Sequence, residues 1–222
     1  MTIQNKHSII NHNSGRCVPP LISAKRHKGG IMKKSFPVLL CVMILLLGFA
    51  VIAAAAEQTS DRRYTLPDHG VFQMKVPASW KEEVQQPDDN RLPPTIAFRP
   101  ASGDQFLILI TPFWQTKKDE PPLSNGEIQK MVQRAADGAQ PNAAEKTLKI
   151  IEIRGSAGRG YYFSATDKAP EAGGYKYLTQ GALLVGELTV TFTILTNEDK
   201  KDVDSAALTM LKGAINVKDK EN

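Results

Sequence analysis

An uncharged apolar run over residues 36–52 divides this chain and determines which part of it can form a compact fold. Lys33 and Lys34 precede the run, and three consecutive alanines at positions 54–56 follow it. A short positive segment, an apolar stretch and small residues at a cleavage point form the pattern of a secretory signal peptide. The folded body is therefore expected to lie after position 56, on the far side of a membrane.

The predicted organisation has three parts: an N-terminal extension (1–31) that is untranslated or disordered, a signal peptide (32–56), and a single exported α+β domain (57–222) in the periplasm or the medium. In an alternative, residues 36–56 stay uncleaved. About 20 apolar residues can span a bilayer, and positive flanks stay inside. The chain would then be a single-span membrane protein with its domain outside. A mature N-terminus at Glu57 would exclude that tether.

Without the leader, the remaining chain differs from the whole sequence in net charge and in its content of cysteine and histidine. Residues 57–222 hold 21 Lys and Arg against 23 Asp and Glu, a formal charge of −2, which does not favour nucleic acid as a partner. Both cysteines precede Glu57, and His69 is the one histidine that follows it. We therefore expect no disulfide, no cofactor, no Cys- or His-based metal site and no catalytic residue.

Alternation of apolar and polar residues predicts the strands. It is strictest near the C-terminus, where Leu188, Val190 and Phe192 point to one face and the threonines between them to the other. The expected strands span residues 70–77, 95–98, 106–110, 148–153, 161–165, 175–185 and 187–196. Residues 57–65 are expected to be a flexible start, and residues 85–94 and 117–123 to be loops.

Two helices are expected. Ser124 and Glu127 match a capping box, and apolar residues follow at steps of three and four as far as Ala139. A second apolar stripe runs over residues 203–215, with Asn197 or Asp199 as its cap. Strands, a helix, strands and a helix, in that order, predict an α+β fold with an antiparallel sheet flanked by two helices.

Three residues are candidates for a partner or ligand surface: Trp114, Arg154 and Arg159. Phe113 and Trp114 are consecutive on a strand, so one of them points away from the core, and an exposed Trp is a common binding anchor. Arg154 and Arg159 flank a Gly/Ser-rich turn. This turn is either a plain hairpin connection or an anion-binding nest, and the absence of a following helix favours the former.

The acidic residues leave an enzymatic alternative open. Asp88, Asp89 and Asp104 could serve a carboxylate-based envelope enzyme if two of them faced one pocket and one had a strongly shifted pKa. Their positions on Pro- and Gly-rich connections favour a solvated surface instead.

The sequence resembles the PsbP-like fold superfamily, which includes bacterial exported PsbP- and DcrB-like proteins. The resemblance rests on an opening strand with Gly70, Phe72, Met74, Val76, Pro77 and Trp80, on the Thr-rich strand 188–196, and on a final helix with Ala207, Met210 and Leu211. It implies an α/β/α sandwich and no catalytic motif. It further implies an exported, non-enzymatic binding or accessory module of the cell envelope, whose partner is an envelope protein or a small ligand.

Overall fold

The computed structural model describes residues 58–89, 92–115, 121–198 and 201–218, all within one compact unit that spans Ala54–Asn222. The predicted extension and signal peptide lie outside these residues. Among the residues described, no helix is both long enough and apolar enough to cross a membrane.

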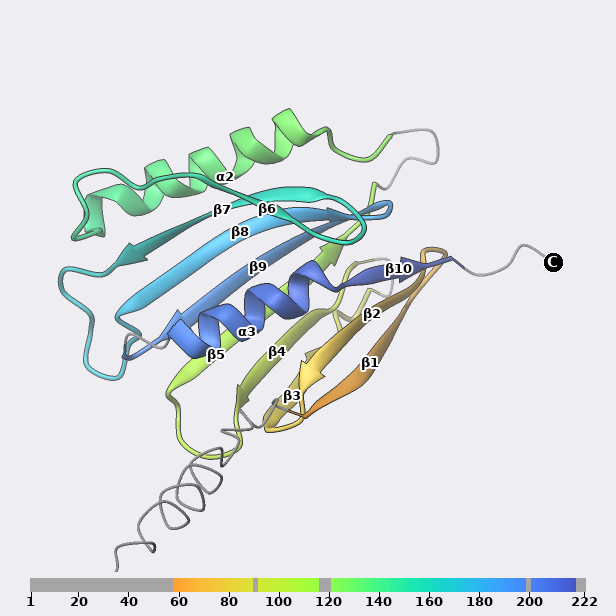
Figure 1. Cartoon of the computed structure of the whole chain (residues 1–222), viewed down its shortest axis with the longest axis horizontal. Coiled ribbons are helices and arrows are strands. Elements are labelled where there is room, and N and C mark those ends of the chain that lie inside the picture. Colours follow the sequence, from red (N-terminus) through yellow and green to blue (C-terminus); the bar gives the residue numbers. More distant parts are fainter. Residues whose placement is uncertain (1–57, 90–91, 116–120, 199–200, 219–222) are drawn as a thin grey trace, which may run out of the picture. The chain divides into compact units, whose positions relative to one another are not determined.

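A seven-stranded antiparallel sheet forms most of the fold, in the order β3-β4-β5-β9-β8-β7-β6 (Figure 1). Its strands are β3 (Trp80–Gln85), β4 (Thr95–Pro100), β5 (Phe106–Phe113), β6 (Ile151–Arg154), β7 (Arg159–Thr166), β8 (Tyr177–Val185) and β9 (Leu188–Thr196). The predicted alternation in β9 is confirmed, because Leu188, Val190 and Phe192 are buried in one cluster. Strand β9 lies between β5 and β8 although it follows both in the sequence.

A second antiparallel sheet, in the order β1-β2-β10, replaces the single expected sheet with two. Its strands are β1 (Thr59–Leu66), β2 (Gly70–Pro77) and β10 (Ile215–Val217). The expected flexible start is wrong, since β1 pairs with β2 along its whole length. The prediction failed because polar residues occupy most of β1, and the buried members of its pattern are Tyr64 and Leu66.

The two α-helices are α2 (Asn125–Ala139) and α3 (Lys201–Lys212), and a short 3-10 turn, η1 (Gln140–Asn142), follows α2. The predicted capping box is present: Ser124 Oγ accepts from the Glu127 N–H at 3.3 Å, and the Ser124 N–H donates to Glu127 Oε2 at 2.8 Å. These bonds from Ser124 lower the pKa of Glu127. Helix α3 ends before its predicted limit, because Ile215 pairs with β2 instead.

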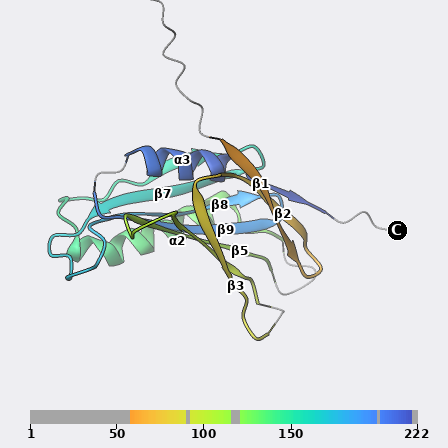
Figure 2. The same cartoon turned by 90° about the horizontal axis from the view of Figure 1, so that it is seen from below.

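The helices pack against opposite faces of the large sheet, as the two views show (Figures 1 and 2). Neighbouring strand residues separate the two cores: Ala182 belongs to the cluster with α2, and Leu183 to the cluster with α3. The α2 core contains Ile128, Val132, Ala136, Ala143, Leu148, Phe163 and Ala165. The larger core lies on the other face of the large sheet and is formed by that face, α3 and the small sheet. It includes Phe72, Met74, Phe98, Ile110, Phe192, Met210 and Leu211.

Glu145 lies in the connection after α2, and its carboxylate is hydrogen-bonded to the end of β7. Its Oε2 accepts from the Thr166 N–H at 3.0 Å, and its Oε1 accepts from the Thr166 hydroxyl at 2.8 Å. Partial burial opposes ionisation of this carboxyl, but the bonds from Thr166 outweigh it, so the pKa of Glu145 is lowered. The charged form is therefore the one that supports the fold.

We expect Glu145→Gln to lower the free energy of unfolding at pH 7 by about 1 kcal/mol, since the bonds to a charged acceptor lie near the surface. A carboxyl with a lowered pKa stabilises the fold above its unfolded-state pKa, and that contribution is lost as the pH falls through the folded-state value. Urea titrations between pH 7 and pH 3 should show the difference from the parent shrinking with acid. Glu171→Gln, at an exposed loop position, is the control and should leave the free energy of unfolding at pH 7 close to that of the parent.

Candidate functional site

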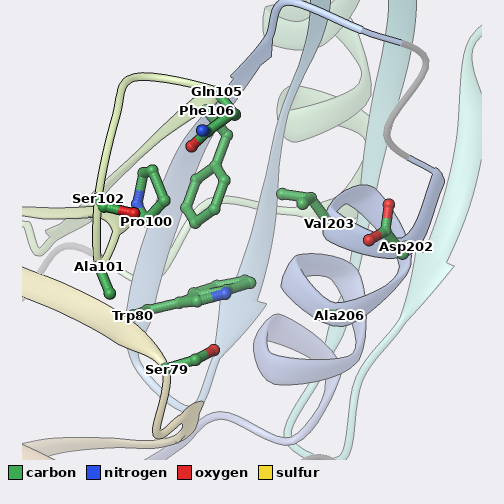
Figure 3. Close-up of a pocket in the computed structure, with 10 residues that line it drawn as sticks. All are labelled: Ser79, Trp80, Pro100, Ala101, Ser102, Gln105, Phe106, Asp202, Val203 and Ala206. Atoms are coloured by element: carbon green, nitrogen blue, oxygen red, sulfur yellow. The ribbon is translucent and has the colours of Figure 1, made fainter.

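A hollow of about 370 Å³ lies between the first turns of α3, the β2–β3 turn and the β4–β5 turn (Figure 3). We call it the Trp80 hollow. It is lined by Ser79, Trp80, Pro100, Ala101, Ser102, Gln105, Phe106, Asp202, Val203 and Ala206. Its volume is at the lower end of the range typical of sites for small molecules, and its lining is divided about equally between polar and apolar surface.

Two aromatic side chains form one wall of the Trp80 hollow. The rings of Trp80 and Phe106 lie with their centroids 5.2 Å apart and their planes at 54°, a tilted arrangement favoured by aromatic pairs. Trp80 also packs on Phe98 at 6.2 Å, so the wall is supported from the core behind it. Both wall residues are buried, which fixes their positions. The opposite wall is Val203 and Ala206 of α3.

The rim of the Trp80 hollow is polar. Ser79, Ser102 and Gln105 come from the two turns, and Asp202 from the first turn of α3. An apolar wall with a few polar groups at its edge can hold a small molecule through one apolar group and orient it through another.

A second hollow, of about 320 Å³, lies on the other flank of α3, over β7 and β8. Hydroxyl groups form much of its lining: Ser164 and Thr179 are hydrogen-bonded to each other at 2.8 Å, and Tyr162 and Thr209 lie nearby. It lacks the aromatic wall of the Trp80 hollow, so it offers less apolar surface for a ligand to bury.

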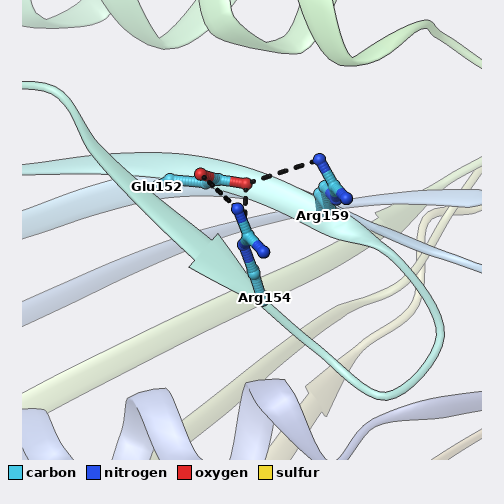
Figure 4. Close-up of polar contacts among 3 residues, drawn as sticks. All are labelled: Glu152, Arg154 and Arg159. Atoms are coloured by element: carbon cyan, nitrogen blue, oxygen red, sulfur yellow. Dashed lines mark hydrogen bonds and ion pairs between the residues drawn. The ribbon is translucent and has the colours of Figure 1, made fainter.

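Arg154 and Arg159, both predicted as surface candidates, are brought together (Figure 4). They are cross-strand partners in the β6–β7 hairpin. Glu152 lies between them: its Oε1 is 3.1 Å from Arg154 Nε and 3.9 Å from Arg159 Nη1. The carboxylate offsets one of the two positive charges, which weakens the pair as an anion site. Both arginine side chains are more than half exposed.

The Gly/Ser-rich turn between these arginines contacts the end of α3. The Ser156 N–H donates to the Lys212 carbonyl at 2.7 Å, and the Ser156 hydroxyl to the Ala214 carbonyl at 3.2 Å. The Gly155 N–H donates to the Gly158 carbonyl within the turn. Two amides that an anion nest would require are thus already committed, so the geometry favours the hairpin interpretation.

The Trp114 side chain is half-buried rather than exposed. Its indole stacks on the imidazole of His69, with centroids 4.8 Å apart and planes at 27°, and it packs against the core on the α3 side. Phe113, its neighbour, is the more exposed of the two at 43%. Strands β9 and β8 separate β5 from β7, so the structure does not place Trp114 beside the arginine pair. A binding role for Trp114 stays a prediction.

The acidic residues considered for catalysis are divided between two ends of β4. Asp88 and Asp89 precede β4, whereas Asp104 follows it and lies 3.9 Å from Arg99. In the stretches that the structure describes, no three His, Cys, Asp or Glu residues are grouped closely enough to hold a metal ion.

Sequence reasoning missed the Trp80 hollow. It named Trp80 as part of the opening strand and did not connect it with Phe106 or with the start of α3. The signal that could have found it was weak: two aromatic residues next to turns, about 25 positions apart, with a helix start about 100 positions further on.

No family model and no curated protein matches this sequence. Among solved structures, the chain is similar to the solution structure of cyanobacterial PsbP (CyanoP) from Synechocystis sp. PCC 6803, at 12% identity and a TM-score of 0.45, over 73% of this chain and 96% of that one. This is the fold group that the sequence resembles. No site residue or function is taken from it.

Proposed function

We propose that this chain is an exported, non-enzymatic binding or accessory module of the cell envelope, and that the Trp80 hollow is where it binds a small ligand. The observation that carries the proposal is the aromatic wall, which is positioned from behind by Phe98 and faces a cavity rather than the core alone. The leader-like sequence at residues 32–56 supports export. The proposed fold assignment is the α/β/α sandwich of the PsbP-like group.

The apolar wall favours a ligand with an apolar or aromatic group of about one ring. A ring placed against Trp80 and Phe106 would remove apolar surface from water mainly on the ligand, at about 25 cal/mol per Å², because the two side chains are already largely buried. The polar rim would then contact the ligand's polar end. No covalent step is required of any lining residue, and binding is the function that this arrangement supports best.

The test uses Trp80 fluorescence with 4-phenyl-1-butanol as the probe. The chain has two tryptophans, so a Trp114→Phe background leaves Trp80 as the single reporter. At roughly 0.3 kcal/mol per heavy atom for about 11 heavy atoms, we expect saturable binding with a dissociation constant on the order of millimolar. Ala206→Phe, which fills the hollow, should weaken binding about fivefold or more, as expected for loss of about 1 kcal/mol of apolar contact.

Ser205→Phe is the matched control, because it adds a ring to the adjacent residue of α3 on the side of the second hollow. Circular dichroism of each variant verifies the fold. The proposal fails if the probe leaves Trp80 emission unchanged, or if Ala206→Phe and Ser205→Phe alter binding equally.

A further inference from the structure

The charge in the lining of the Trp80 hollow is negative. The inference drawn from this charge rests on the function proposed for the hollow. Among the described residues that line the hollow, Asp202 alone carries a charge. The lysines of α3 face elsewhere: Lys201 and Lys212 both line the second hollow, on the opposite flank of the helix. A ligand with a negative group would meet no cationic side chain among these lining residues.

The N-terminus of α3, beside the hollow, favours an anion. A helix dipole amounts to about half a positive charge at that end. Asp202 and Asp204, both in the first turn, each carry a full negative charge close to it. Lys201 and Asp204 both line the second hollow and offset each other in charge, so Asp202 is the charge at the Trp80 hollow, and its full negative charge exceeds the half charge of the dipole.

Asp202 and the aromatic wall lie apart. Figure 3 shows the Asp202 carboxylate at the edge of the hollow, beyond Val203 as seen from the rings of Trp80 and Phe106. A cation held at Asp202 would therefore be connected to a ring on Trp80 by a short flexible chain rather than directly.

We propose that the natural ligand of the Trp80 hollow is a cationic amphiphile, with an apolar or aromatic group packed on Trp80 and Phe106 and a protonated amine paired with Asp202. The amine group contributes through an ion pair at a partly exposed rim, so it adds selectivity to an affinity that the apolar wall provides.

Three probes of equal chain length test this, again in the Trp114→Phe background at pH 7: 4-phenylbutylamine, which is cationic, 4-phenyl-1-butanol, which is neutral, and 4-phenylbutyrate, which is anionic. We expect the amine to bind about two- to fivefold more tightly than the alcohol, the range of an exposed ion pair, and the carboxylate to bind more weakly than the alcohol. Raising the salt concentration from 0.02 to 0.5 M should reduce both differences.

Asp202→Asn should bring the amine and the alcohol to the same affinity. Asp204→Asn is the matched control: it removes the same charge from the same helix turn, but its side chain lines the second hollow. We expect it to keep most of the preference for the amine. An equal effect of the two substitutions would mean that a general field, and not Asp202, selects the ligand, and the inference would be wrong.

The three probes also separate the inference from the proposed function. If the alcohol binds and the amine binds no better, or if the carboxylate binds best, the hollow is a binding site but the cationic preference is refuted. If none of the probes changes Trp80 emission, the hollow is not a site for such ligands and the proposed function itself fails.

Discussion

Replacing Gly160 with alanine is expected to lower the free energy of unfolding by about 3 kcal/mol or more, an overpacking cost beyond the usual range. A Cβ atom at this position would lie 2.1 Å from the Ala182 carbonyl oxygen and 2.4 Å from the Leu183 Cα. These are backbone atoms of β8, so no side chain can rotate away. Strand β7 would have to move from β8, and both cores would be disturbed with it.

Gly138→Ala is the control for this prediction. Gly138 lies in the last turn of α2, and nothing lies within 4 Å of the Cβ it would gain. Alanine is the better helix former, so this variant should be as stable as the parent or up to about 1 kcal/mol more stable. Urea unfolding followed by circular dichroism compares the two. A Gly160→Ala protein as stable as the parent would mean that β7 and β8 do not approach this closely.

Phe192→Ala is expected to be the most destabilising of the core truncations, by about 3–5 kcal/mol. Phe192 is 1% exposed in the middle of β9, opposite Ile110 on one side and Gly181 on the other. Gly181 provides no side chain, and a Cβ there would lie 2.7 Å from the tip of the Phe192 ring. The ring therefore covers Gly181, and its removal leaves a cavity in the core on the α3 side of the sheet.

The same substitution at Phe113 isolates the contribution of burial. Phe113 lies on β5 of the same sheet but is 43% exposed, so Phe113→Ala should cost less than about 1 kcal/mol. The urea midpoints of the two variants, measured side by side, should differ clearly. Comparable losses would contradict the assignment of Phe192 to the main core.

Elements with a regular apolar period could be predicted, and those without one could not. Strand β9 and helix α2 follow their expected patterns closely, because burial imposes a period of 2 or 3.6 on their sequences. Strand β3 was missed because it lies at the edge of the sheet, where Trp80 is its one buried residue. Nothing in its sequence distinguishes such a strand from a charged loop.

The division of the strands into two sheets also could not be predicted from local sequence patterns. Strand β10 has three residues and pairs with β2, about 140 positions earlier in the chain. Whether β10 pairs with β2 depends on where α3 ends and on the direction that the chain takes after the helix. The Trp80 hollow has the same origin, since its walls come from two turns and a helix that only the tertiary fold brings together. The arginine pair, by contrast, follows from a hairpin whose register the local sequence nearly defines.

The late position of β9 in the chain determines the order in which the molecule can be assembled. Strands β3, β4 and β5 form one group and β6, β7 and β8 another, and each group ends in an unpaired edge until β9 occupies the gap between them. The large sheet therefore cannot close before the ribosome has synthesised the chain as far as Thr196. Pairing between such distant segments is slow. The two halves of the large sheet therefore stay separate until β9 is available to join them.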